Sequence, residues 1–280
     1  MITHLWFKLN WSSKFILLIE YDGTQYHGFQ WQVGLPTIQS ELEQAIRRFC
    51  GQSSRAMAAS RTDAGVHANG QVVSFRAKST LDTMTLVKAL NYYLPGDIAV
   101  KSAYRASDDF NVRRDALSRE YHYYILNSNT RSPFSRRFTL LVPKPLDIQV
   151  MNEACQLLLG EHDFASFASS LDDSRSTLRN VYEAGIDTLT CLLPSREKNK
   201  LAPYLIPGER VAIFRIVANA FLPHQIRSTV GLLIRLGLSK IGIEEFRDIM
   251  EARSLGLAGP VAPACGLCLM NVNYPAPLGS

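Results

Sequence analysis

The stretch SRTDAGVHANGQVVSF, which runs from Ser60 to Phe75, joins a polar loop to an apolar segment. The second part of the stretch predicts a strand at 70–76, and a preceding strand is expected at 55–59. Residues 60–69 then form a loop on a rigid frame, and catalytic side chains concentrate in such loops. The stretch therefore marks both a strand pair and a candidate site.

Asp63 is the acidic residue of this loop, and Arg61 lies two residues before it. An ionised carboxylate is a competent nucleophile or base. The alternative is an Asx turn formed by Asp63 with the help of Gly65, and the spacing alone favours that turn. No second carboxylate lies nearby in the sequence, so a paired-acid mechanism has no local support.

Working outward from this stretch, the pattern predicts a β-α-β-β-α-β order in the first part of the chain. The expected elements are a strand at 14–21, a helix at 37–50, strands at 55–59 and 70–76, a helix at 83–93 and a strand at 98–104. The cap signals agree, since Thr37 is a plausible N-cap of the first helix and Gly51 follows the helix.

The second part of the chain repeats this order loosely. Its expected elements are a strand at 121–126, a helix at 147–159, strands at 181–190 and 211–218, helices at 223–236 and 243–252, and a strand at 267–273. A polar stretch at 195–203 is expected to be an exposed excursion. We therefore expect two packed α+β halves, at 14–110 and 111–275, with an N-terminal extension at 1–13 and a tail at 276–280.

The composition is that of a soluble globular protein, with 46% hydrophobic and 20% charged residues in 280. No apolar run is long enough to span a bilayer, and no signal peptide is visible, so we expect a cytoplasmic protein without a membrane partner. The five cysteines then read as reduced thiols. Cys265 and Cys268 form a C-x-x-C, but no second ligand pair accompanies them, which favours packing cysteines over a zinc site.

Basic and aromatic residues gather between Lys101 and Arg137. This window holds eight Lys or Arg and four acidic residues, so it carries +4 of the net charge of +5. Interleaved with these basic residues are Phe110, Tyr121, His122, Tyr123, Tyr124 and Phe134. Arginine neutralises phosphates and aromatic rings stack on unpaired bases, so an RNA surface is one interpretation. A solvated face beside a tyrosine-rich strand is the other.

The sequence of the opening stretch resembles the signature of the tRNA pseudouridine synthase A family (TruA). Other parts of the chain resemble that family in the same order, from about Lys14 to Pro275. They are IEYDGTQYHGFQWQ (19–32), NYYLPGDIAV (91–100), DDFNVRRDALSREYHYYI (108–125), LLGEHDFASF (158–167), ANAFLPHQIRSTVGLL (218–233) and GLCLMNVNYP (266–275). The resemblance implies a pseudouridine synthase fold, with two pseudo-repeated halves forming one extended, mixed, mainly antiparallel sheet flanked by helices around a central cleft.

The resemblance also implies residue roles. Asp63 corresponds to the catalytic aspartate, Arg61 to an arginine that assists base flipping, and Arg227 to the arginine that pairs with the carboxylate. Tyr121 corresponds to the residue that stacks on the uracil and helps to remove a proton late in the reaction. The implied RNA-contacting residues are Phe110, Asn111, Val112, Arg113, Arg114, Leu171, Asp172, Asp173, Ser174 and Arg175.

Three positions depart from the family pattern. Ser60 replaces a common glycine, Phe29 a usual tryptophan, and Pro223 a bulkier or polar residue.

The implied activity is isomerisation of uridine to pseudouridine in the anticodon stem-loop of tRNA, at positions 38–40. The implied protein uses no metal or organic cofactor and is a homodimer whose tRNA contacts both subunits. Asp63 could attack C6 of the uracil, attack C1′ of the ribose, or abstract the 2′ proton, and the sequence leaves these routes open. A catalytically silent tRNA-binding or chaperone protein with the same fold is the alternative function.

Overall fold

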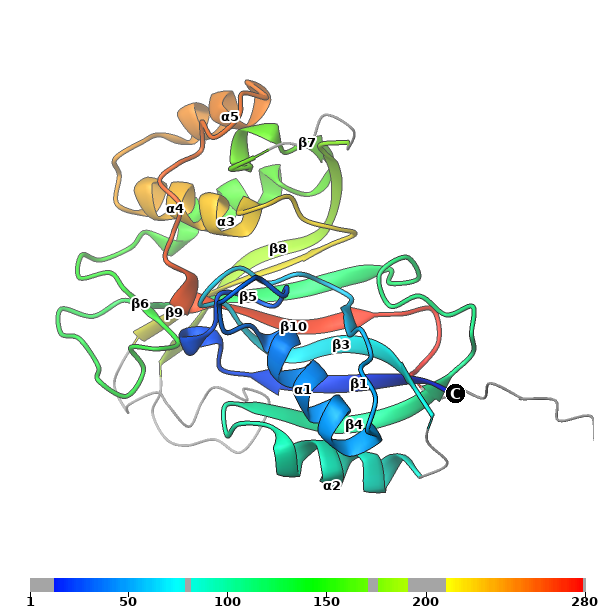
Figure 1. Ribbon diagram of the computed structural model, residues 1–280. Helices are drawn as coiled ribbons and strands as arrows, with labels where there is room; N and C mark the ends of the chain where they lie inside the picture. Colours follow the sequence, from blue (N-terminus) through cyan, green and yellow to red (C-terminus); the bar gives the residue numbers. More distant parts are fainter. Residues whose placement is uncertain (1–12, 79–81, 171–175, 191–209, 279–280) are drawn as a thin grey trace, which may run out of the picture.

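The computed structural model describes residues 13–78, 82–170, 176–190 and 210–278. A ten-stranded sheet runs through the molecule, with helices packed on both of its halves (Figure 1). The strand order is β4-β1-β3-β10-β5-β9-β8-β7, with β2 paired to β3 and β6 paired to β5. The pairings β3–β10 and β5–β6 are parallel and the others are antiparallel. The predicted α+β class, with one extended and mainly antiparallel sheet flanked by helices, is confirmed.

The first half has the predicted β-α-β-β-α-β order. Its elements are β1 (Ser13–Tyr21), α1 (Ile38–Cys50), β2 (Met57–Ala58), β3 (His67–Ala77), α2 (Thr83–Tyr93) and β4 (Ile98–Ala106). The hydroxyl of Thr37 accepts a hydrogen bond from the backbone N–H of Ser40 at the start of α1, and Gly51 ends the helix with φ 66°. These are the cap positions that the sequence predicts.

The second half contains β5 (Ser118–Leu126), β6 (Leu140–Leu141), α3 (Ile148–Leu157), β7 (Gly160–Asp163), β8 (Leu178–Thr190), β9 (Arg210–Ala218), α4 (Gln225–Gly237), α5 (Ile243–Glu251) and β10 (Leu267–Asn273). The order β10-β5-β9-β8 in this half matches the order β4-β1-β3-β2 in the first half. The loose repeat in the sequence is therefore a repeat in sheet topology.

The structure departs from the expected elements around the opening loop, and it also adds β6 and β7, which the sequence pattern does not predict. Strand β2 has two residues instead of five, and β3 begins at His67, three residues before the predicted start. The early start follows from pairing on both sides, because Ala68 is opposite Tyr21 of β1 and opposite Leu269 of β10. Since β2 is short, it leaves the first part of the β3 edge open, and β10 pairs there and joins the two halves.

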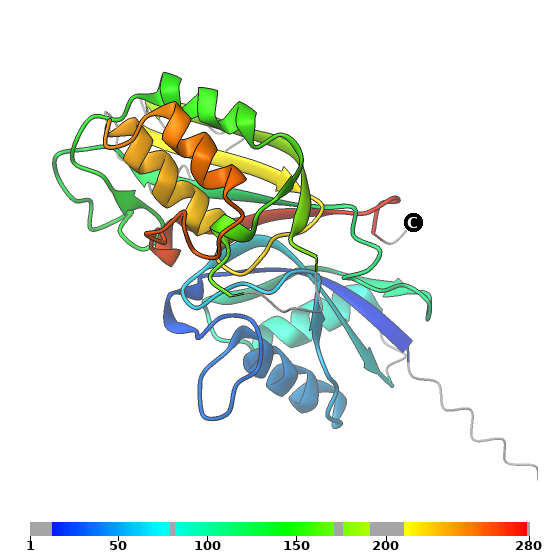
Figure 2. The ribbon, with the colours of Figure 1, turned by 90° about the horizontal axis from the view of Figure 1, so that it is seen from above.

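The hydrophobic core continues across both halves of the sheet. Helices α1 and α2 pack on the first half, and α3, α4 and α5 gather on the second (Figure 2). Phe15 of β1 and Phe75 of β3 stack with ring centroids 5.5 Å apart inside this core. Among the described residues, none of the helices has the length and apolar character that a bilayer span requires.

Candidate active site

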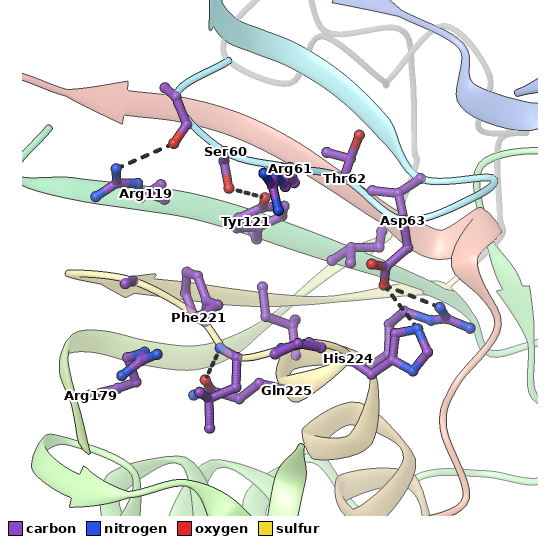
Figure 3. Close-up of a pocket in the computed structure, with 18 of the residues that line it drawn as sticks. Ser60, Arg61, Thr62, Asp63, Arg119, Tyr121, Arg179, Phe221, His224 and Gln225 are labelled. Carbon is purple, nitrogen blue, oxygen red and sulfur yellow. Dashed lines mark hydrogen bonds and ion pairs between the residues drawn. The ribbon is translucent and has the colours of Figure 1, made fainter. Parts of the chain in front are cut away.

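A pocket of about 420 Å³ opens where the two halves meet, a volume suited to one small ligand or nucleotide unit. Its walls come from the β2–β3 loop, the start of β5, and the segment between β9 and α4 (Figure 3). The polar or aromatic residues that line it include Ser60, Arg61, Asp63, Arg119, Tyr121, Arg179, Phe221, His224 and Arg227.

Backbone contacts hold the loop that carries Asp63. The N–H of Val66 donates to the carbonyl of Asp63 at 3.1 Å, and Gly65 between them has φ 76°, a value that glycine adopts at little cost. The N–H of Phe29 donates to the carbonyl of Thr62 at 3.0 Å. The loop is thus a turn and a site at once, because the turn presents Asp63 to the pocket.

Two nitrogen-bearing side chains from α4 and its start meet one oxygen of Asp63. Nη1 of Arg227 lies 3.3 Å from Oδ2, and Nε2 of His224 lies 3.4 Å from the same atom (Figure 3). In the described part of the chain, Oδ1 has no hydrogen-bond partner. The guanidinium stabilises a negative charge on the carboxylate, and the second oxygen is left for a ligand. Nε of Arg227 donates to the carbonyl of Ala262 at 2.7 Å, which fixes the guanidinium.

The sequence interpretation did not identify His224 as a site residue. A histidine that follows Pro223 at the start of a helix is more often structural than catalytic. Its backbone has φ 61°, the left-handed region that non-glycine residues rarely adopt. Such strained residues cluster at functional sites. The spacing of His224 and Arg227 gives no helix-face signal, because His224 is the N-cap of α4 and lies outside the helix.

Tyr121 lies in the wall of the pocket with its ring against Phe221. The two ring centroids are 5.4 Å apart in an edge-to-face arrangement, and the Tyr121 hydroxyl lies 2.9 Å from the Ser60 hydroxyl. Burial raises the pKa of Tyr121 far above its ordinary value, an effect that outweighs the hydrogen bond with Ser60. The side chain is therefore a phenol at neutral pH. Phe221 supplies a second aromatic wall that the sequence interpretation did not identify.

Arg119 connects the segments around the pocket. Its guanidinium donates to the carbonyls of Ala59, Arg113 and Asn219, at 3.3, 2.7 and 2.7 Å. These atoms belong to the start of the Asp63 loop, to the link between the halves and to the end of β9. Burial lowers the pKa of Arg119. In Figure 3, Arg119 and Arg179 lie at one end of the pocket and Asp63 and His224 at the other.

Arg61 does not contact the carboxylate that it neighbours in sequence. Its side chain is exposed and lines the pocket, whereas Arg227 makes the ion pair with Asp63. Arg61 is therefore available to a ligand in the pocket.

We next compared the sequence of this chain with those of known protein families. The profile of the family described as tRNA pseudouridine synthase matches residues 17–115 and 154–275. The chain belongs to that family. It is an isomerase family, so the predicted class of enzyme is confirmed.

Individual relatives of this chain carry the name of the same family. A protein of Roseiflexus castenholzii named tRNA pseudouridine synthase A is 38% identical over 92% of this chain and 90% of its own length. Proteins of the same name from Chloroflexus aurantiacus and Francisella tularensis are each 36% identical, over 92% and 94% of this chain and 88% and 95% of their own lengths.

In this member of the tRNA pseudouridine synthase family, the side chains of the RNA-contacting residues expected at 110–114 differ in their exposure to solvent. Arg113 and Arg114 are exposed, and Arg113 lines the pocket. Phe110 is half-buried with its ring 5.3 Å from that of Tyr274. The side chain of Val112 is fully buried in the hydrophobic core, so any RNA contact at this position would be made by its backbone. The predicted residues Leu171 to Arg175 lie outside the described part of the chain.

The tyrosine-rich strand is mostly structural. Tyr123 and Tyr124 are buried, so of the tyrosines in β5 only Tyr121 lines the pocket. The interpretation of that segment as a series of stacking faces is therefore wrong for Tyr123 and Tyr124, which alternate between the two sides of the sheet.

The two cysteines of the C-x-x-C differ in burial, since Cys265 is half-buried and Cys268 is buried. Cys268 is buried in β10, and burial raises its pKa to about 12 and also raises that of Cys265. Within the described residues, no group of three or more His, Cys, Asp or Glu side chains is arranged to hold a metal ion.

Proposed function

We propose that this protein isomerises uridine to pseudouridine in the anticodon stem-loop of tRNA, at positions 38–40, with Asp63 as the catalytic carboxylate. The observation that carries the proposal is the Asp63 carboxylate in a pocket between the two halves, held through Oδ2 by Arg227 and His224. The relatives named tRNA pseudouridine synthase A support the substrate.

The size of the pocket supports a nucleotide removed from its stack. About 420 Å³ accepts one base with its ribose but not a base-paired helix, so the target uridine must leave the helix to reach Asp63. The ring of Tyr121 and that of Phe221 offer apolar walls to a planar base, and stacking contributes roughly 1–3 kcal/mol per base. We propose that Arg61, which lines the pocket, takes the space of the displaced base.

The reaction breaks the N1–C1′ bond and forms a C5–C1′ bond in the same nucleotide. Attack of Asp63 on C6, attack on C1′ and removal of the 2′ proton all begin with a carboxylate oxygen that is free to approach the nucleotide. Arg227 and His224 contact Oδ2, and Oδ1 then meets the substrate. Because the guanidinium is already in place, no reorganisation is needed when charge moves during the reaction.

We further propose that two copies act together, as the resemblance to the family implies, with one tRNA contacting both subunits. Light scattering is expected to give twice the chain mass of 31.3 kDa. A species of the single-chain mass would contradict this part of the proposal.

Mapping of the product tests the function. Unmodified tRNA transcripts with uridine at position 38, 39 or 40 are incubated with the protein, and pseudouridine is located by chemical adduct formation and primer extension. Pseudouridine is expected at those positions and at no other uridine. Transcripts with cytidine at all three positions serve as the control, and pseudouridine in them would contradict the positional assignment.

A further inference from the structure

Ser60 and Tyr121 form a pair of hydroxyl groups in the pocket wall. Their oxygens lie 2.9 Å apart, and either one can donate the hydrogen bond. In the described part of the chain, each hydroxyl has the other as its hydrogen-bond partner. Both residues line the pocket that contains Asp63 (Figure 3).

The orientation of Ser60 is fixed by Gln71, a fully buried residue of β3. The N–H of Ser60 donates to Oε1 of Gln71 at 3.3 Å, and Nε2 of Gln71 donates to the Ser60 carbonyl at 2.7 Å. The same Nε2 lies 3.4 Å from the Tyr21 hydroxyl. Because both backbone groups of Ser60 are held, its Cβ stays beside Tyr121, and the hydrogen bond between the two hydroxyls sets the direction of the Ser60 hydroxyl.

Tyr121 cannot act as a free phenolate. Its side chain is 4% exposed, and burial followed by the nearby charge of Asp63 raises its pKa far above neutral. A phenol of this kind accepts a proton only if it gives up its own at the same time. The nearest group that can take that proton is the Ser60 hydroxyl.

We propose that Ser60 is a positioning residue that relays a proton for Tyr121 in the last step of the isomerisation. In this step the newly attached base carries no bond to Asp63, and its C5–H bond breaks. The electron pair of that bond forms the C5=C6 double bond, while the second pair of the C6=N1 double bond moves to N1. The proton passes to Oη of Tyr121, the Tyr121 hydroxyl proton passes to Oγ of Ser60, and the Ser60 hydroxyl proton passes to water. The ring nitrogen N1 takes one proton from water, so both side chains end as they began.

This inference rests on the proposed function, and kinetics with deuterium at C5 of the target uridine test it separately. If C5–H cleavage depends on the relay, Ser60→Ala should slow turnover by about 100-fold or more. It should also increase the deuterium isotope effect on turnover, because proton removal becomes rate-limiting. Ser60→Thr keeps a hydroxyl and is expected to restore the isotope effect of the wild type.

A purely structural role gives a different result. Loss of folded protein lowers the rate but leaves the isotope effect unchanged, because the remaining enzyme follows the same steps. Ser60→Ala with the isotope effect of the wild type would therefore overturn the relay. In a Tyr121→Phe background, Ser60→Ala should cause no further loss, and an additive loss would equally contradict it. If the wild type forms no pseudouridine at all, the proposed function fails instead.

Discussion

Nη1 of Arg227 lies 3.3 Å from Oδ2 of Asp63, although 164 residues separate them in the sequence. Asp63 belongs to the β2–β3 loop of the first half, and Arg227 belongs to α4 of the second half. The parallel pairing of β3 with β10 joins the halves next to this loop. The candidate site therefore exists only when the two halves are packed together.

Removal of the charge at Arg227 should affect the reaction more than RNA binding. We expect Arg227→Gln to lower kcat by about 10²–10³-fold, the usual loss for a preorganised electrostatic contact. The Kd for tRNA should change little, because the guanidinium contacts Asp63 and the carbonyl of Ala262. Single-turnover rates and filter binding measure the two quantities. An equal loss in both would show that Arg227 binds RNA instead.

Because His224 has a left-handed backbone, we expect its replacement by glycine to raise the stability of the fold and to lower the rate of turnover. Glycine adopts φ 61° without strain, so His224→Gly should stabilise the fold by about 1 kcal/mol. In a chain of this size the Tm should rise by about 2–4 °C. Turnover should fall, because the contact of Nε2 with Asp63 is lost. His224→Ala is the matched control, since it loses the contact and keeps the strain; unchanged turnover in both variants would exclude His224 from the site.

Two adjacent arginines should contribute unequally to tRNA binding. Arg113 lines the pocket, whereas Nε of Arg114 lies 2.7 Å from Oδ1 of Asp115. Each lost phosphate contact lowers the slope of log K against log salt by about 0.7–0.9. We expect this decrease for Arg113→Ala and a smaller one for Arg114→Ala. Arg247→Ala in α5 is the control for loss of charge, and a slope for Arg113→Ala equal to that of this control would remove Arg113 from the RNA interface.

Stability at low pH should depend on Glu120. Burial alone would raise the pKa of Glu120, but hydrogen bonds from Arg215 and His122 outweigh it and hold the pKa below the ordinary 4.5. The ionised form is then favoured by folding, so its contribution is present above pH 4.5 and is lost as the pH falls through the lowered pKa. Glu120→Gln should cost on the order of 1–3 kcal/mol at pH 7.

Urea unfolding at pH 7, 5, 4 and 3 measures this difference. The gap between wild type and Glu120→Gln should narrow as the pH falls below 4.5. If the difference in the free energy of unfolding is constant over this pH range, the charge of Glu120 does not contribute to the stability of the fold.

Much of the fold is local in origin and is visible in the sequence. The helix 83–93 and the strand 267–273 have the predicted bounds, because their apolar periodicity and their stop signals agree. The start of β3 was placed too late, since His67 and Ala68 are paired by strands that are distant in sequence. Pairing with strands that are distant in the sequence cannot be predicted from the local pattern of apolar and polar residues.

The site residues likewise fall into those that the local sequence identifies and those that depend on contacts between distant parts of the chain. Asp63 could be located because a recognisable stretch surrounds it, and spacing alone favoured a simple turn. The contact of His224 depends on how α4 docks against the other half, which no local pattern encodes. The burial of the Val112 side chain also depends on the packing of the folded chain, and a resemblance between segments does not show which of their side chains are buried.

Tritium release from tRNA labelled at C5 of uridine tests the central claim most directly, since the C5 hydrogen must leave when pseudouridine forms. The wild type should release tritium, and Asp63→Asn should release it on the order of 10⁴-fold more slowly, a loss typical of a missing catalytic side chain. Asp248→Asn, the same change on an exposed position of α5, should match the wild type. Release by Asp63→Asn at the wild-type rate would contradict the assignment of Asp63 as the catalytic carboxylate.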